Sequence, residues 1–169
     1  MWVGPYESLI PGWTLVVRDD QKLVGYLNGC PNTHEFEWRR RILHDWALAA
    51  RVVAGRFPNN QDTQSFLLRC CGLEQAPNQR FSREVREALR KTFPAHLHMN
   101  LTGEYRGQGI GLLLLEEYFK RLREARIAGV HVHCDQAPLG FYQKAGLDLL
   151  ERQQLPDGKS IFVLTKELN

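Results

Sequence analysis

A glycine-rich segment between two regular patterns limits what this chain can fold into more than any other feature. A β-type run at residues 95–101 leads into three alternating glycines within residues 107–111, and these open a helical pattern that reaches about Ala128. A second β-type run follows at residues 130–134, and the helix after it ends at Gly146. Strand, helix and strand in this order are typical of a parallel βαβ crossover. We therefore expect an α/β fold around a mixed sheet.

Two hairpins add antiparallel strands to the predicted sheet. Residues 13–17 and 22–27 are rich in β-forming side chains and are separated by a short polar turn. Residues 149–154 and 160–165 form a second pair, joined by a turn at residues 156–159. The predicted architecture has antiparallel N-terminal strands, a central βαβ unit and a C-terminal hairpin.

The segment between the first hairpin and the crossover is predicted to be helical. Asn32, with Glu35 three residues later, is typical of a capping box. The apolar residues that then recur at helical spacing are Trp38, Ile42, Trp46, Ala49, Ala50 and Val53. They predict one amphipathic helix. Two shorter helices are expected around residues 66–67 and 85–89, the second with Ser82 as its N-cap.

Composition excludes several classes of protein. With 43% apolar and 24% charged residues, the chain is expected to form one globular domain over residues 1–169. A formal charge of +3 without clustered Lys and Arg argues against nucleic acid, and the densest run, Arg39-Arg40-Arg41, fits a solvated helix face. No apolar run approaches the ~20 residues of a membrane span, and no signal-peptide pattern precedes the first strand. We therefore expect a cytoplasmic protein.

The four cysteines predict no disulfide framework. Cys30, Cys70, Cys71 and Cys134 contain no Cys-x-x-Cys pair, and all are expected to be reduced, buried thiols. Cys134 is a nucleophile in principle, but the sequence shows no paired base for it. A covalent enzyme intermediate is therefore not expected.

The alternating glycines are suited to binding a phosphate. Glycine lets the backbone approach a ligand, and the free amides at a helix N-terminus point toward an anion. Arg106, beside the first glycine, adds a charged donor. A Walker loop is excluded because Gly-Lys-Ser and Gly-Lys-Thr are absent, and a dinucleotide fingerprint is excluded because Leu112 stands where it needs glycine. The alternative is a tight strand-to-helix turn without a ligand.

Two motifs in this region resemble those of one enzyme family. Residues 101–111 are similar to the signature of the GNAT N-acetyltransferases, matched at Arg106, Gly109 and Gly111. About 30 residues later, the run Phe141-Tyr142-Gln143-Lys144-Ala145-Gly146-Leu147 resembles the family's second motif. The resemblance implies the GNAT acyl-CoA acyltransferase fold, with the βαβ crossover as its cofactor unit and acetyl-CoA (coenzyme A) as the cofactor.

The same resemblance implies which residues hold coenzyme A. The residues implied for its pyrophosphate are Arg106, Gly107, Gln108, Gly109, Ile110 and Gly111. The strand edge at Asn100 and Leu101 is implied to pair with the pantetheine arm. A sheet that splays between residues 95–101 and 130–134 would leave backbone groups that such an arm satisfies. Asp135 stands where the family often has asparagine and is assigned to the cofactor site.

A narrower resemblance covers most of the chain from about Pro5. The run Phe93 to Asn100, the strand at residues 24–26 and Asp135 are similar to the acetyltransferase-like domain of O-GlcNAc hydrolases and its bacterial relatives. Some members of that group resemble enzymes whose phosphate loop has decayed, whereas the loop here is intact. Cofactor binding is therefore better supported than catalysis.

Three residues are candidates for proton transfer, since acyl transfer to an amine needs a base for the amine and an acid for the thiolate. Tyr142 is the predicted acid, because the motif tyrosine of the family lies near the thioester sulfur; packing at a helix end is the alternative. His96 and His98 share one strand face with Asn100 by their alternation with apolar residues. Resemblance to GNAT members such as serotonin acetyltransferase suggests that His98 with His96 relays the amine proton.

The histidines have other interpretations. His131 and His133 alternate with valines on the next strand, so histidine is either a structural or substrate-lining residue of the sheet surface, or part of a transition-metal site. No carboxylate cluster supports a metal, so none is assigned.

The sequence thus predicts an acetyl-CoA-dependent N-acetyltransferase that transfers an acetyl group directly to an amine of a small molecule or protein. The alternative is a non-catalytic acyl-CoA-binding or protein-interaction module of the same fold. Residues 28–94 are expected to build the acceptor pocket. Its groove is expected either to be open or to be completed by a partner subunit, as in a homodimer. Neither nucleic acid nor a membrane is expected as a partner.

Overall fold

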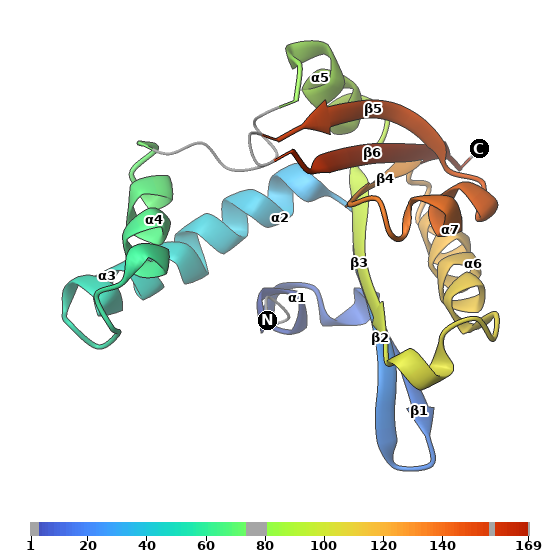
Figure 1. Cartoon of the computed structure of the whole chain (residues 1–169), viewed down its shortest axis with the longest axis horizontal. Helices are drawn as coiled ribbons and strands as arrows, with labels where there is room; N and C mark the ends of the chain where they lie inside the picture. Colours follow the sequence, from blue (N-terminus) through green and yellow to red (C-terminus); the bar gives the residue numbers. More distant parts are fainter. Residues whose placement is uncertain (1–3, 74–80, 156–157, 169) are drawn as a thin grey trace.

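One mixed sheet organises the molecule (Figure 1). The computed structural model describes residues 4–73, 81–155 and 158–168. The strands of the described residues, in the order in which they lie side by side, are β1 (Thr14–Asp19), β2 (Lys22–Cys30), β3 (Ala95–Leu101), β4 (Gly129–Cys134), β6 (Ser160–Glu167) and β5 (Asp148–Gln154). This arrangement confirms the expected α/β fold.

Helices cover both faces of the sheet. Those on one face are α6 (Ile110–Glu124) and α7 (Leu139–Lys144). Those on the other face are α1 (Gly4–Leu9), α2 (Thr33–Arg40) and α5 (Arg83–Lys91). The short 3-10 turns are η1 (Pro11–Trp13), before β1, and η4 (Gly103–Tyr105), after β3. Ser82 caps α5 as predicted, since its hydroxyl accepts the amide of Val85 at 3.2 Å.

Both predicted hairpins are present. β1 and β2 pair antiparallel from Thr14 with Asn28 to Asp19 with Lys22, and Asp20 takes a left-handed φ of 48° in the turn. β5 and β6 also pair antiparallel. Residues 156–157 of the second predicted turn lie outside the described residues.

β3 and β4 run parallel but pair over a very short distance. Their register consists of Ala95 with Val130 and His96 with His131, although both strands continue beyond these residues. β3 stays paired to β2, and β4 to β6, along their other edges. The two halves of the sheet therefore diverge, as expected. The unpaired facing edges of β3 and β4 beyond His96 and His131 are called the open seam below.

The main core lies between the sheet and α6. Tyr118 and Leu122 of α6 are fully buried in it. The Tyr118 hydroxyl accepts the amide of Cys30 at 3.0 Å and donates to the carbonyl of His96 at 2.8 Å. Gly29 makes room for the ring, because a Cβ there would lie 2.1 Å from it. The hydroxyl thus stands between β2 and β3 where their paired residues Cys30 and His96 face each other.

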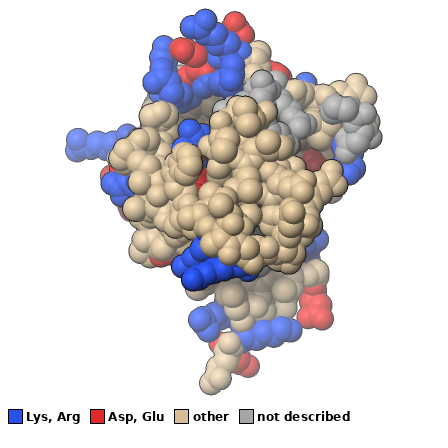
Figure 2. Space-filling model, turned by 90° about the vertical axis from the view of Figure 1, so that its left-hand side faces the viewer, with Lys and Arg blue, Asp and Glu red and all other residues tan. Residues whose placement is uncertain are grey.

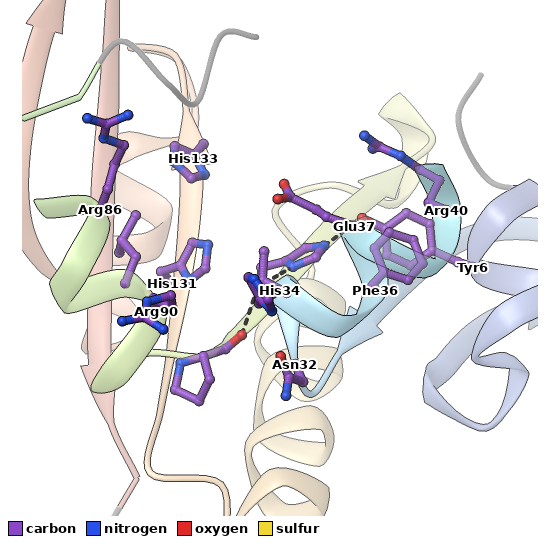
Figure 3. A pocket seen from close by; sticks show the side chains of 14 residues that line it. Tyr6, Asn32, His34, Phe36, Glu37, Arg40, Arg86, Arg90, His131 and His133 are labelled. Atoms are coloured by element: carbon purple, nitrogen blue, oxygen red, sulfur yellow. Dashed lines mark hydrogen bonds between the residues drawn. The ribbon is translucent and has the colours of Figure 1, made fainter. Parts of the chain in front are cut away.

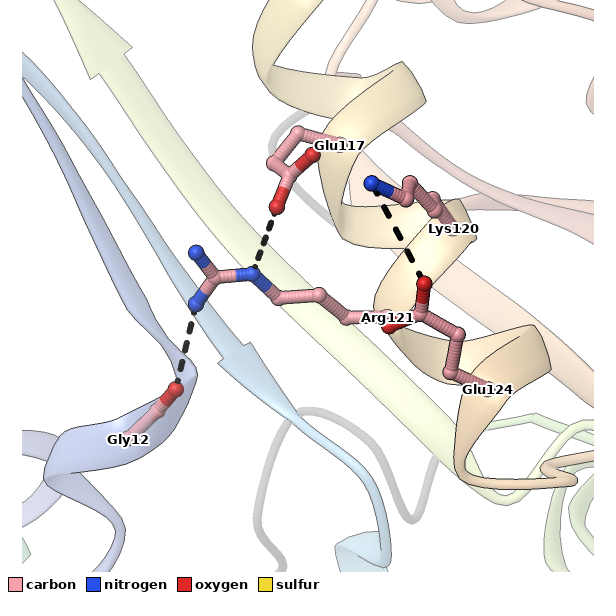
Figure 4. Close-up of polar contacts among 5 residues, drawn as sticks. All are labelled: Gly12, Glu117, Lys120, Arg121 and Glu124. Atoms are coloured by element: carbon pink, nitrogen blue, oxygen red, sulfur yellow. Dashed lines mark hydrogen bonds and ion pairs between the residues drawn. The ribbon is translucent and has the colours of Figure 1, made fainter.

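One arginine ties α6 to the N-terminal segment (Figure 4). Arg121 donates from Nε to the Glu117 carboxylate at 2.9 Å and from Nη1 to the carbonyl of Gly12 at 3.3 Å. Lys120 and Glu124 form a longer ion pair, at 4.0 Å, on the exposed side of the helix. The contact with Gly12 holds α6 beside the entry into β1.

Two helical predictions need correction. α6 ends at Glu124 rather than near Ala128, because Arg126 takes a left-handed φ of 57°. The single helix predicted after the first hairpin is instead α2, the π-helical turn η2 (Arg41–Asp45) and α3 (Trp46–Val53).

The apolar face of this helical segment is largely exposed, contrary to the usual burial of an amphipathic stripe. Ala49 is buried, but Trp38 is 61% exposed and Val53 is 77% exposed. α4 (Gln61–Cys70) packs against α3, and the pair extends away from the sheet. Figure 2 views this end of the molecule and shows a broad uncharged surface, with the basic residues of α5 above it. No described helix combines the length and the apolar character needed to cross a membrane.

The cysteines are free thiols in two different settings. Cys30 and Cys134 are buried as predicted, and burial raises the pKa of their thiols to about 12 and about 11. Cys70 is only partly buried and Cys71 is exposed at the end of α4. The prediction of buried thiols is therefore wrong for this adjacent pair.

Candidate functional site

The predicted phosphate loop leads directly into α6. Gly107 and Gly109 take left-handed φ values of 77° and 82°, which residues with a side chain rarely adopt. Gly109 is the N-cap of α6, and no side chain in the described part of the chain caps the helix. Within the described parts of the chain, the amides of residues 107–111 bind no acceptor. The loop therefore presents free N–H groups at the positive end of a 15-residue helix.

Side chains of the loop turn back toward β3. Arg106 donates from Nε to the carbonyl of Leu101 at 2.9 Å and from Nη2 to Oδ1 of Asn100 at 3.3 Å. Gln108 donates to the carbonyl of Glu104 at 2.8 Å. These bonds brace the loop against the end of the strand and use none of its amides at residues 107–111, of which residues 107–109 are exposed.

The main chain of β3 faces the open seam at every second residue. The amide of Thr102 donates to the carbonyl of Val24, so the even-numbered residues of β3 turn their main-chain groups to β2. Asn100 is one of these: its main chain faces β2, and its side chain accepts the hydrogen bond from Arg106. Met99 and Leu101 turn their main-chain groups to the seam, where the arginine described above already occupies the Leu101 carbonyl.

The second sequence motif packs against the loop. A Cβ on Gly111 would lie 3.0 Å from the Phe141 ring, so this glycine lets α7 approach the start of α6. Tyr142 follows in α7 and is 6% exposed, and burial raises the pKa of its phenol to about 12. Its hydroxyl is therefore protonated at neutral pH. Asp135 is exposed and shapes the turn into α7, since its Oδ1 accepts the amide of Ala137 at 3.1 Å.

A cavity of about 450 Å³ opens on the face of the sheet opposite α6 (Figure 3). α2 lines it with Phe36, Glu37 and Arg40, and α5 lines it across from them with Arg86 and Arg90. The two histidines that form the last pair between β3 and β4 also line it. The cavity therefore borders the point where the open seam begins.

His96 is held on both sides of its ring. Thr33 Oγ1 donates to the carbonyl of Pro94 at 2.7 Å, so it accepts from Nδ1 of His96, also at 2.7 Å. Nε2 of His96 then accepts from the Tyr6 hydroxyl at 2.7 Å. Burial, with His131 contributing, lowers the pKa of His96 well below its ordinary value. His96 is thus neutral and takes up a proton only after the bond to Tyr6 breaks.

His131 has a different arrangement. Its Nδ1 donates to the carbonyl of Phe93 at 2.7 Å, which leaves Nε2 as an acceptor, without a partner among the described residues. Burial lowers the pKa of His131 to about 4, partly opposed by the bond to Phe93. His133 lies 5.3 Å away, ring to ring, and burial followed by His131 lowers its pKa to about 4. His98 is exposed on β3, and burial of part of its ring lowers its pKa.

No family model matches the sequence, but solved structures resemble this fold. The protein named SsHAT superposes with a TM-score of 0.70 over 98% of this chain and 77% of that chain, at 25% identity. A Drosophila melanogaster polyamine N-acetyltransferase, which forms N-acetylagmatine, gives 0.58 over 95% and 77%, at 16% identity. An acetyltransferase of the GNAT family from Streptococcus pneumoniae gives 0.52 over 92% and 66%, at 14% identity. The chain has the GNAT acyltransferase fold.

Within this GNAT fold, the candidate residues lie in two places. The glycine loop and Tyr142 lie on the α6 side of the sheet, whereas His96 and His98 lie on the opposite face. No three His, Cys, Asp or Glu side chains of the described residues converge on a metal site.

Sequence reasoning missed several residues of the cavity. Tyr6 and Thr33, which hold His96, lie 90 and 63 residues before it along the chain, and no local pattern links either of them to this histidine. Arg86 and Arg90 had a usable signal, since they are four residues apart on a predicted helix and flank the buried Leu89.

Proposed function

We propose that this protein is an acetyl-CoA-dependent N-acetyltransferase that acetylates an amine of a small molecule or a protein. The observation that carries the proposal is the row of free main-chain amides at residues 107–111, at the start of α6 and beside the open seam. A diphosphate fits such a row because a helix N-terminus favours negative charge. An amide-bearing arm fits the seam because Met99 turns unpaired main-chain groups toward it.

When bound, acetyl-CoA would supply an acetyl thioester, and the protein would orient the reactants and exchange protons. Tyr142 lies on the α6 side of the sheet in α7, and its neighbour Phe141 packs against Gly111 at the start of α6, so the phenol comes from the helix that contacts the loop. Its raised pKa keeps the hydroxyl protonated, and it would give this proton to the thiolate as the C–S bond breaks. The new C–N bond forms in the same transfer, and a histidine accepts the proton that the amine nitrogen loses.

His98 is the proposed acceptor of the amine proton, with His96 as the next group in the relay. Support for His98 is its exposure and its place on the same strand face as His96. Transfer onward to His96 requires the Tyr6 hydroxyl to leave Nε2. A His98→Gln variant that keeps both the rate and the pH profile of the native enzyme would remove His98 from this role.

A second candidate function is supported by the same contacts. Tyr142 is buried, and the ring of His96 is fully hydrogen-bonded, which fits a protein that binds acyl-CoA without turning it over. The narrower resemblance to the acetyltransferase-like domain of O-GlcNAc hydrolases stays a prediction and fits either function.

Calorimetry with acetyl-CoA, combined with free-thiol release over a panel of amines, separates the two candidates. An enzyme is expected to lose about 100-fold in turnover on Tyr142→Phe, the usual size of an acid or base effect, while its affinity for acetyl-CoA is retained. A binding module gives heat with acetyl-CoA but releases no thiol with any amine. Absence of heat with acetyl-CoA overturns both.

A further inference from the structure

We propose that the cavity between α2 and α5 binds a small amine acceptor that also carries an anionic group, a carboxylate or a phosphate. The inference rests on the proposed N-acetyltransferase function and names the class of its acceptor. The cavity volume of about 450 Å³ is in the range of sites that enclose small molecules. An amine inside it would lie beside His96 and His131, where the open seam begins.

The anionic group is inferred from two arginines on α5. Arg86 and Arg90 are one turn apart and both line the cavity. Over the described ranges, neither guanidinium group forms an ion pair or a hydrogen bond, and the carboxylate of Glu87 on the same helix is paired with Lys91 at 2.9 Å. Like charges four residues apart destabilise a helix. A bound anion would remove this repulsion and would accept charge-assisted hydrogen bonds from both guanidinium groups.

Packing fixes the direction of these arginines. Leu89 is buried in a small cluster with Phe81 and Val163, so α5 presents a defined side to the sheet. Figure 3 shows Arg86 and Arg90 on the α5 side of the cavity, next to the histidines of β4.

The opposite wall has a different charge pattern. Glu37 and Arg40 come from α2, and Arg40 lies 3.4 Å from the carboxylate of Asp45. Glu37 and Arg40 thus place one charge of each sign on this wall, and Arg40 has a further carboxylate beside it at Asp45. The unpaired positive charge of the cavity is concentrated on the α5 side, so an acceptor would place its anionic end there and its amine toward the seam.

The test uses pairs of amines that differ only in charge. The first pair is phosphoethanolamine and ethanolamine, and the second is β-alanine and β-alaninamide, so the two pairs distinguish phosphate from carboxylate. Thiol release from acetyl-CoA is expected to be at least about tenfold more efficient for the anionic member of one pair or both, the usual size of a charged hydrogen bond. Equal efficiency within both pairs overturns the inference.

Variants of α5 test whether its two cavity arginines cause the preference for anionic amines. Arg86→Gln and Arg90→Gln are each expected to raise the KM for the preferred anionic amine by about tenfold with little change in kcat, and to leave the neutral member unaffected. Arg83→Gln removes the same charge from the same helix outside the cavity and is the matched control. If all three variants raise KM equally, the effect is a general one of net charge and the cavity is not the site.

Direct binding keeps this inference separate from the proposed function. If acetyl-CoA binds and the neutral amines are acetylated faster than the anionic ones, the inference is contradicted but the proposed N-acetyltransferase function is retained. If acetyl-CoA gives no heat, calorimetry of phosphoethanolamine and β-alanine with the native protein still decides whether the cavity binds anionic amines. Binding that is lost in the double variant of Arg86 and Arg90 supports the cavity as their site, and no binding of either compound overturns it.

Discussion

Replacing Tyr118 by phenylalanine would remove one oxygen atom from the fully buried position between β2 and β3. That oxygen accepts the amide of Cys30 at 3.0 Å and donates to the carbonyl of His96 at 2.8 Å. The ring still fits, so no large cavity forms, but one buried donor and one buried acceptor lose their partner. Each such group costs about 1–3 kcal/mol, so the free energy of unfolding should fall by about 2–6 kcal/mol.

Urea denaturation measures this loss. With a slope of about 2 kcal/mol per molar urea, the midpoint of Tyr118→Phe should fall by roughly 1–3 M. Tyr105→Phe is the matched control, because that hydroxyl donates to the Asp19 carboxylate at the surface, where such a change is expected to stay within about 0.5 kcal/mol. Equal midpoints for the two variants would refute the bridging role of Tyr118.

Three further predictions concern the loop and the cavity. Gly109→Ala places a side chain at a φ of 82° and should lower the free energy of unfolding in urea by about 1–2 kcal/mol. The same variant should bind acetyl-CoA more weakly in calorimetry. Unchanged binding would contradict the role of the loop as the pyrophosphate site. Gly111→Ala brings a methyl group to 3.0 Å from Phe141, and urea denaturation should show a loss of about 1–3 kcal/mol, whereas native stability would mean that the ring moves freely. Because burial lowers the pKa of His131 to about 4, the unfolded chain gains its proton first as the pH falls below about 6.5, and stability is lost from there toward pH 4. Between pH 7 and 5, His131 should account for a loss of about 2 kcal/mol in the free energy of unfolding. This loss should be absent in His131→Gln, whereas the separate loss due to His133, whose pKa is also about 4, should remain. A variant with the same pH dependence of stability as the native protein would contradict the lowered pKa of His131.

The sequence predicted the crossover and both hairpins because each depends on local chemistry. Alternating β-forming residues, short polar turns and a glycine run before a helical pattern leave few other ways to arrange residues 95–134. The loop conformation followed from the same residues, since Gly107 and Gly109 supply the left-handed backbone that the turn needs.

The exposed apolar face of α2 and α3 and the cavity depend on contacts that the sequence does not reveal. Periodicity showed that Trp38 and Val53 belong to a stripe, but it does not show whether anything covers that stripe. The state of His96 depends on Tyr6, 90 residues earlier in the chain, and no local pattern predicts this bond. Alternation along β3 placed His96 on the correct face without indicating that both ring nitrogens are occupied.

The short register between β3 and β4 leaves the molecule as two three-stranded halves, β1-β2-β3 and β4-β6-β5, joined by two residue pairs. Any molecule that forms hydrogen bonds to both edges of the open seam would link the two halves. The rigidity of the whole sheet would then depend on whether that molecule is bound. Amide hydrogen exchange along Leu97 to Leu101 would measure this coupling. The amides that face the open seam should exchange more slowly only when a bound molecule holds the two halves together.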